Sequence, residues 1–206
     1  MFKYIKLILG VTLSSLSIAM VINCGLGAFA ITTCNMALSN WFRISLGLAG
    51  FISEAVMLLY ATVKGEGLGW TAIVNATYGS FMIDIFSRLL PHSIFLSIGL
   101  IILPVAWAIT GSVGLGDTGS NLLTNALIKS TGKSIRFIRT IIEVTVLLIG
   151  FLGARSFVTW FTIVMTLTIG HIAQFIYKLI KYNPTDIEHK YLIQLNKSKN
   201  KEMKRI

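Results

Sequence analysis

Long apolar runs separated by short polar turns dominate the chain. Six of them are long enough for membrane-spanning helices, since about 20 apolar residues cross the roughly 30 Å hydrocarbon core of a bilayer. These predicted spans cover residues 5–24, 46–63, 69–90, 93–112, 135–153 and 157–181. Two further segments, 28–42 and 117–131, would cover only about 22 Å as helices. They fit half-helices that enter or line the membrane better than full spans.

The first half of this pattern recurs in the second half at an offset of 89 residues. Gly25-Leu26-Gly27 aligns with Gly114-Leu115-Gly116, and Glu54 aligns with Glu143. Leucine matches are common between membrane sequences, but a paired-glycine turn and a single acid inside an apolar run are not. The pattern therefore indicates an internal repeat, a feature of many transporters.

Repeat 1 covers about residues 5–90 and repeat 2 about residues 93–181. Each contains three spans and a half-helix that follows the Gly-Leu-Gly turn. An odd number of spans per repeat places the second copy upside down relative to the first. We therefore expect an all-α integral membrane protein built from two inverted repeats of three transmembrane helices.

The charges near the second span of each repeat agree with this inversion. With a cytoplasmic N-terminus, that span begins outside in repeat 1 and inside in repeat 2. Gly47 and Gly50 lie there in repeat 1, and Arg136 and Arg139 in repeat 2, as expected from the excess of Lys and Arg on the cytoplasmic side. The alternative counts the half-helices as spans and gives eight spans in parallel 4+4 repeats. The overall charge distribution slightly favours that alternative, whereas segment length and polarity oppose it.

The composition supports a membrane protein, and the C-terminal end of the chain is basic. Of 206 residues, 54% are hydrophobic and 13% charged, and the mean hydropathy is +0.77, whereas soluble domains carry about 25% charged residues. We expect residues 1–181 to form a single transmembrane domain, followed by a lysine-rich tail of residues 182–206. We expect this tail to be cytoplasmic and to contact anionic lipid headgroups. It lacks the interleaved aromatic residues typical of nucleic-acid binding, so no nucleic-acid partner is predicted.

Three motifs of the second half carry a resemblance to a known family. They are Gly114-Leu115-Gly116-Asp117, Thr131-Gly132-Lys133-Ser134 and Arg139-Thr140-Ile141-Ile142-Glu143. In a doubled unit they resemble the YczE/YitT-type small bacterial membrane proteins, and the YczE-like branch fits best because no soluble domain follows. The resemblance implies a multi-pass protein of the bacterial cell membrane, and it implies no biochemical activity.

Glu54 and Glu143 are the first candidates for a functional site. Each lies near the centre of a predicted span, where an acid costs roughly 2.5–3.5 kcal/mol and indicates function by default. Arg139 precedes Glu143 by four residues, which permits an ion pair on one helix face. A structural pair and a transport residue both remain open for Glu143. Glu54 has no charged residue at that spacing, so its alternative role is a hydrogen bond to a neighbouring helix.

The glycine turn of repeat 2 supplies a third acid. Asp117 follows Gly116 and suits an N-cap of the half-helix. The start of a half-helix can also attract anionic substrate groups through its dipole, with Arg136 and Arg139 close by in sequence. The segment lacks the Lys-Ser/Thr of a phosphate-binding loop. No catalytic triad or metal-ligand spacing is readable, so we predict no enzyme activity, cofactor or metal.

These features favour a small secondary transporter or permease of an unidentified solute. Its midplane site would lie near Glu54 and Glu143, with Asp117, Arg136 and Arg139 along the substrate or ion pathway. One alternative is a non-transporting accessory or regulatory membrane protein that acts through its basic tail. A second alternative is a translocase of lipid or polyprenyl phosphate that uses the arginines. The sequence is also compatible with a homodimer.

Overall fold

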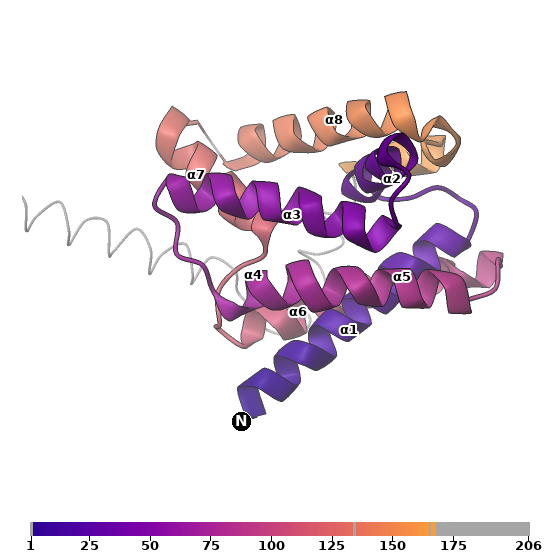
Figure 1. Ribbon diagram of the computed structural model, residues 1–206, viewed down its shortest axis with the longest axis horizontal. Helices are drawn as coiled ribbons and strands as arrows, with labels where there is room; N and C mark the ends of the chain where they lie inside the picture. The colour runs from indigo at the N-terminus through magenta and orange to yellow at the C-terminus, as the bar shows by residue number, and fades with distance from the viewer. Residues whose placement is uncertain (1, 134, 165, 168–206) are drawn as a thin grey trace, which may run out of the picture.

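The computed structural model describes residues 2–133, 135–164 and 166–167 (Figure 1). Every element in that part of the chain is a helix, as predicted. The first half contains α1 (Phe2–Asn23), α2 (Ala30–Phe42), α3 (Leu46–Val63), α4 (Trp70–Val74), the π-helix η1 (Asn75–Gly79) and α5 (Ser80–Leu89). The second half contains the 3-10 helix η2 (Ile94–Ile98), α6 (Gly99–Ser112), α7 (Gly119–Thr131), α8 (Ile135–Gly153) and the 3-10 helix η3 (Arg155–Phe157).

Three helices are long and apolar enough to cross a membrane, namely Phe2–Asn23, Leu46–Val63 and Ile94–Ser112. Their outer faces carry exposed apolar side chains. On α3, for example, Val56, Leu59 and Val63 are 62%, 68% and 76% exposed. Such faces suit contact with lipid rather than water. These three helices indicate a membrane protein. Helix α8 coincides with the predicted span 135–153, but it carries two arginines and an acid.

The predicted spans 69–90 and 157–181 are described to different extents. The predicted span 69–90 is observed as one unbroken helical stretch in which α4, η1 and α5 follow each other directly. Of the predicted span 157–181, residues 160–164 and 166–167 are helical. The remainder of that span and the basic tail of residues 182–206 lie outside the described residues.

Small side chains form much of the interior. Alanines on six helices are fully buried: Ala19, Ala37, Ala49, Ala61, Ala72, Ala106 and Ala126. Gly47 shows why small residues are needed, because a Cβ atom there would overlap the Ser80 carbonyl oxygen and the Asp84 carboxylate. Its own N–H donates to Asp84 Oδ1 over 2.7 Å. Asp84 of α5 therefore accepts a hydrogen bond from one of the N–H groups that have no partner within the first turn of α3. Close helix packing through small residues is typical inside membranes.

Helices α2 and α7 have 13 residues each, or about 20 Å at 1.5 Å per residue. Each follows a Gly-Leu-Gly turn in which both glycines have positive φ: 75° and 122° at Gly25 and Gly27, and 68° and 102° at Gly114 and Gly116. Residues with a Cβ atom rarely adopt these angles, which explains the glycine at all four positions. Both helices also end in a left-handed residue, Arg43 or Gly132.

The two halves of the chain interlock through these short helices. Helix α2 of the first half packs on α8 of the second, whereas α7 of the second half packs on α3 of the first (Figure 1). Thr33 and Ala37 would contact any side chain added at Gly150 and Gly153. Leu122 and Ala126 pack against Ala61 in the corresponding contact. Each short helix therefore packs most extensively against the half to which it does not belong.

The glycine turns are held in the same way. The Leu115 carbonyl accepts from the Thr71 N–H at 3.3 Å, and the Leu26 carbonyl accepts from the Thr159 hydroxyl. A Cβ atom at Gly69 or Gly116 would overlap the backbone of the other segment. Contacts across the halves therefore fix where α2 and α7 begin.

Candidate functional site

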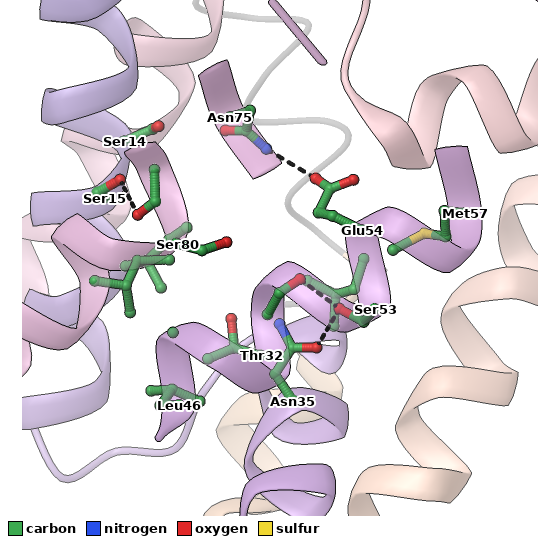
Figure 2. A pocket seen from close by; sticks show the side chains of 16 residues that line it. Ser14, Ser15, Thr32, Asn35, Leu46, Ser53, Glu54, Met57, Asn75 and Ser80 are labelled. Atoms are coloured by element: carbon green, nitrogen blue, oxygen red, sulfur yellow. Dashed lines mark hydrogen bonds between the residues drawn. The ribbon is translucent and has the colours of Figure 1, made fainter. Parts of the chain in front are cut away.

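Glu54 lies in the middle of α3, where Figure 2 shows its hydrogen bond to Asn75, and both of its carboxylate oxygens contact other elements. Oε1 accepts a hydrogen bond of 2.8 Å from Asn75 Nδ2, at the first residue of the π-helix. Oε2 is buried and has no hydrogen bond of standard geometry within the described chain. It lies against the backbone of Gly119, the first residue of α7. The interhelical hydrogen bond expected as the alternative role of Glu54 is therefore present.

The position of Gly119 gives Glu54 a second role. The first turn of a helix carries unpaired N–H groups and the positive end of the helix dipole, which stabilise a nearby negative charge. Glu54 of the first half thus lies where α7 of the second half begins. A Cβ atom at position 119 would overlap Glu54 Oε2, so the absence of a side chain at Gly119 is what permits this contact.

A polar cavity of about 80 Å³, cavity 1, lies beside Glu54. It is bounded by α1, α2, α3, the π-helix and α5 (Figure 2). Its polar lining, apart from Glu54 and the two amides Asn35 and Asn75, consists of five hydroxyl side chains: Ser14, Ser15, Thr32, Ser53 and Ser80. Glu54 is the charged member of this lining.

The π-helix accounts for part of this polar surface. A π turn inserts an extra residue per turn and commonly marks a functional site. Here Asn75 of the π turn donates a hydrogen bond to Glu54. The Gly79 carbonyl accepts a hydrogen bond of 2.9 Å from Ser15 Oγ on α1. Gly79 also lies close to Val11 of α1. The π turn therefore joins α1 and α3 at the edge of cavity 1.

Cavity 2 has a volume of about 100 Å³ and contains the second acid, Glu143 of α8. Arg139, Ser120 and Thr124 also line it, together with the first turn of α2 and apolar side chains such as Trp107. Ile18, Ile31 and Thr32 line both cavities. The two acids therefore lie in adjoining cavities, with the start of α2 between them.

Arg139 is engaged with the start of α7. Its Nη1 donates to Asn121 Oδ1 over 3.2 Å, and Asn121 Nδ2 donates to Asp117 Oδ1 over 2.9 Å. Within the described chain, Arg139 and Glu143 form no ion pair of 4 Å or less. The same-face pair that the sequence permits is thus replaced by a chain of hydrogen bonds from Arg139 to Asp117.

The N-cap prediction for Asp117 is wrong by one residue. Thr118 is the N-cap of α7, with extended backbone and no side-chain capping bond. Asp117 precedes it, lines neither cavity and reaches Arg139 only through Asn121. Of the five candidate residues, Glu54, Glu143 and Arg139 line cavities. The side chain of Arg136 lies outside the described part of the chain.

The two cavities use equivalent positions of the sequence repeat. Eight residues of cavity 1 correspond, at an offset of 89, to eight of cavity 2. The pairs are Ser14 with Leu103, Ile18 with Trp107, Ile31 with Ser120, Asn35 with Thr124, Gly50 with Arg139, Ser53 with Ile142, Glu54 with Glu143, and Met57 with Val146. Both cavities contain the acid of the Glu54–Glu143 pair. At the Gly50–Arg139 pair, cavity 1 has a glycine and cavity 2 has the cationic arginine.

The hydroxyl groups of cavity 1 were not among the candidates. Serine on an apolar helix commonly bonds to its own backbone, so its type alone does not distinguish a site from a packing residue. The one sequence signal was their density on the first span, where Ser14, Ser15 and Ser17 lie close together and are all buried. Asn75 makes an interhelical hydrogen bond with Glu54.

Comparison with known proteins gives one match. No curated protein and no solved structure matches the chain significantly. A family model described as a family of unknown function, DUF6198, matches residues 1–178. That range includes both short helices, both acids and both cavities. The chain therefore belongs to the DUF6198 family.

Proposed function

We propose that the protein is a small secondary transporter of the bacterial cell membrane, with its solute path through the two adjoining cavities. One observation carries the proposal. Each half of the chain supplies an acid from a long apolar helix, and each acid lines a cavity beside the first turn of a short helix. Acids are expensive in a bilayer, at roughly 2.5–3.5 kcal/mol each, and those inside membrane helices commonly serve ion or substrate pathways.

The arrangement of the halves supports alternating access by inverted repeats. In Figure 1, α3 ends beside α7, whereas α8 begins there and ends above α2, so the two equivalent helices run in opposite directions. Helices of about 20 Å are too short to cross a hydrocarbon core of about 30 Å. This favours six spans plus two half-helices over eight spans. Transporters of this kind bind their substrate near the midplane, between repeats and at half-helix starts.

The same arrangement leads us to propose a YczE-like, multi-pass topology with both termini in the cytoplasm. Arg139 and Lys129 then lie toward the cytoplasmic side of the second half, as the positive-inside bias requires. Binding and movement of a solute need only the polar groups of the two cavities, so we assign transport rather than catalysis.

The test begins with the purified protein. A thermal-shift screen against soluble solutes and against lipids identifies a stabilising compound, and uptake of that compound is then measured in proteoliposomes. Glu54→Gln and Glu143→Gln should each reduce uptake by about tenfold or more, equivalent to roughly 1.4 kcal/mol. Glu202→Gln, the same chemical change in the C-terminal tail, should leave uptake unchanged.

Two results would reject this function. One is full uptake by correctly folded Glu54→Gln and Glu143→Gln proteins, which would exclude the central acids from the mechanism. The other is stabilisation by anionic lipid alone with no soluble solute active in the screen, which would favour the lipid translocase.

A further inference from the structure

Cavity 1 contains an acid, Glu54, for which no other residue of its lining supplies a countercharge. Glu54 lines it, and none of the other residues that line it carries a charge. The start of α7 at Gly119 offsets part of the carboxylate's charge. A buried carboxylate normally pairs with a cation, binds a metal ion or becomes protonated. The chemistry of the remaining lining distinguishes between these possibilities.

Three of the four serine hydroxyls that line cavity 1 already donate their protons to protein acceptors. Ser15 Oγ donates to the Gly79 carbonyl at 2.9 Å, and Ser14 Oγ donates to the Val11 carbonyl at 3.0 Å. Ser53 Oγ donates to Asn35 Oδ1 at 2.7 Å. A hydroxyl has one proton and two lone pairs. These three side chains therefore offer lone pairs to an occupant of the cavity.

Two further hydroxyls face the same space. Thr32 and Ser80 point into the cavity in Figure 2, and both residues are buried. Within the described chain neither hydroxyl has a hydrogen-bond partner. Together with Glu54 Oε1 they extend an oxygen-rich surface contributed by α1, α2, α3 and α5. The Asn35 amide nitrogen also faces this space and suits a water molecule bound beside an ion.

Size and charge restrict the occupant further. A volume of about 80 Å³ is well below the roughly 300–1,000 Å³ of pockets for drug-sized ligands, but it accommodates an ion with a few waters. Hard cations prefer carboxylate, hydroxyl and carbonyl oxygens. A single carboxylate supplies one negative charge and so balances one positive charge. A proton needs only one acceptor and would leave the surrounding hydroxyl lone pairs unused.

We propose that cavity 1 is a binding site for a monovalent cation of the size of Na⁺, with Glu54 as its charged ligand. The hydroxyls of Thr32 and Ser80 are further ligands. This inference deepens the proposed transport function by naming a coupling ion, and its coupling role rests on that function. Cation binding itself is measured without transport, so the two proposals can fail separately.

The experiment measures thermal unfolding of the purified full-length protein in NaCl and in choline chloride at equal ionic strength and pH. Na⁺ should raise Tm by on the order of 5 °C at saturation, because a ligand that binds only the folded protein stabilises it. Ser80→Ala should weaken the apparent affinity for Na⁺ by about tenfold, and Glu54→Gln should abolish the shift. Glu143→Gln, which removes the equivalent acid from cavity 2, should retain it.

Thr77→Ala is the matched control for Ser80→Ala. Thr77 lies three residues earlier on the same stretch of helix, is exposed and bonds only to the Ile73 carbonyl in the described chain. Its loss should leave the Na⁺ shift unchanged. Equal Tm in NaCl and choline chloride would overturn the inference, as would a shift that persists in Glu54→Gln. Stabilisation that follows pH alone, without dependence on Na⁺, would assign the site to a proton and also overturn it.

Discussion

At the scale of single residues, Gly119 is the position that allows an acid of one half to reach the helix start of the other. Alanine there would overlap Glu54 Oε2. Although alanine favours a helix over glycine by about 1 kcal/mol, we expect Gly119→Ala to destabilise the protein by about 1–3 kcal/mol, as overpacking does. Thermal unfolding in detergent measures this as a lower Tm.

Gly50→Ala provides the comparison for Gly119→Ala. Gly50 is also helical and buried, but its nearest atoms lie 3.4 Å and 3.5 Å from an added Cβ, an ordinary contact distance. This substitution should leave Tm unchanged or slightly higher. If Gly119→Ala proved as stable as Gly50→Ala, the packing of Glu54 against the start of α7 would be wrong.

Asn75 provides a second test at this scale, because its amide donates to Glu54 Oε1 over 2.8 Å. Removing a donor from a buried charged group costs about 1–3 kcal/mol. A double-mutant cycle of Asn75→Ala and Glu54→Gln, followed by thermal unfolding, should give a coupling energy of about 1–2 kcal/mol. Additive effects of the two substitutions would show that the hydrogen bond does not contribute to stability.

Sequence alone identified the acids because a charge in an apolar run is conspicuous and because Glu54 recurs as Glu143. It misplaced the N-cap because Asp and Thr are both good caps and adjacent in the chain. The choice between them depends on backbone angles: Thr118 has φ −76° and ψ 162°. The hydroxyls of cavity 1 were missed because burial and cavity position depend on partners distant in the chain.

At the scale of elements, an ion pair joins the end of α7 to the loop between α3 and α4. Lys129 Nζ lies 2.6 Å from Glu66 Oε1, and the two side chains are 28% and 4% exposed. Lys129 also lies in the last turn of α7, where a cation is favoured by the helix dipole. This contact therefore connects the two halves at one end of the bundle.

Removing the cation should deprive the buried Glu66 carboxylate of its ion pair with Lys129. Such losses cost about 3–5 kcal/mol for fully buried pairs, and the exposure of Lys129 lowers our expectation to about 1–3 kcal/mol for Lys129→Met, measured by thermal unfolding. Adding Glu66→Gln to Lys129→Met should recover part of the loss. If the double variant were no more stable than Lys129→Met alone, the ion pair would not be the cause.

The lengths of the elements were more predictable than their internal geometry. Segments 28–42 and 117–131 became the 13-residue helices α2 and α7, since a glycine turn marks the start of each. The π-helix inside the stretch 70–89 was not predicted, because the apolar pattern is compatible with regular α-helix throughout. The π-helix instead makes contacts with another element, since the Gly79 carbonyl accepts a hydrogen bond from the Ser15 hydroxyl of α1.

At the scale of the whole molecule, the interlocking of the halves was not predictable from the repeat. An offset of 89 residues shows that two segments are equivalent, but not which segments touch. The structure pairs α2 with α8 and α3 with α7, so each short helix packs most extensively against the opposite half. One consequence is that each acid lies beside the short helix of the opposite half, and cavity 2 is lined by residues from both halves.

The orientation of the halves in the membrane gives the last prediction. Phe42 and Thr131 are equivalent positions at the ends of α2 and α7, and both are exposed. Inverted repeats place Phe42 outside and Thr131 in the cytoplasm. In a protein whose buried Cys24 and Cys34 are replaced by alanine, an impermeant maleimide should label Phe42→Cys in intact cells. It should label Thr131→Cys only after permeabilisation. Labelling of both positions from the same side would instead support the parallel arrangement with eight spans, in which the short helices cross the bilayer.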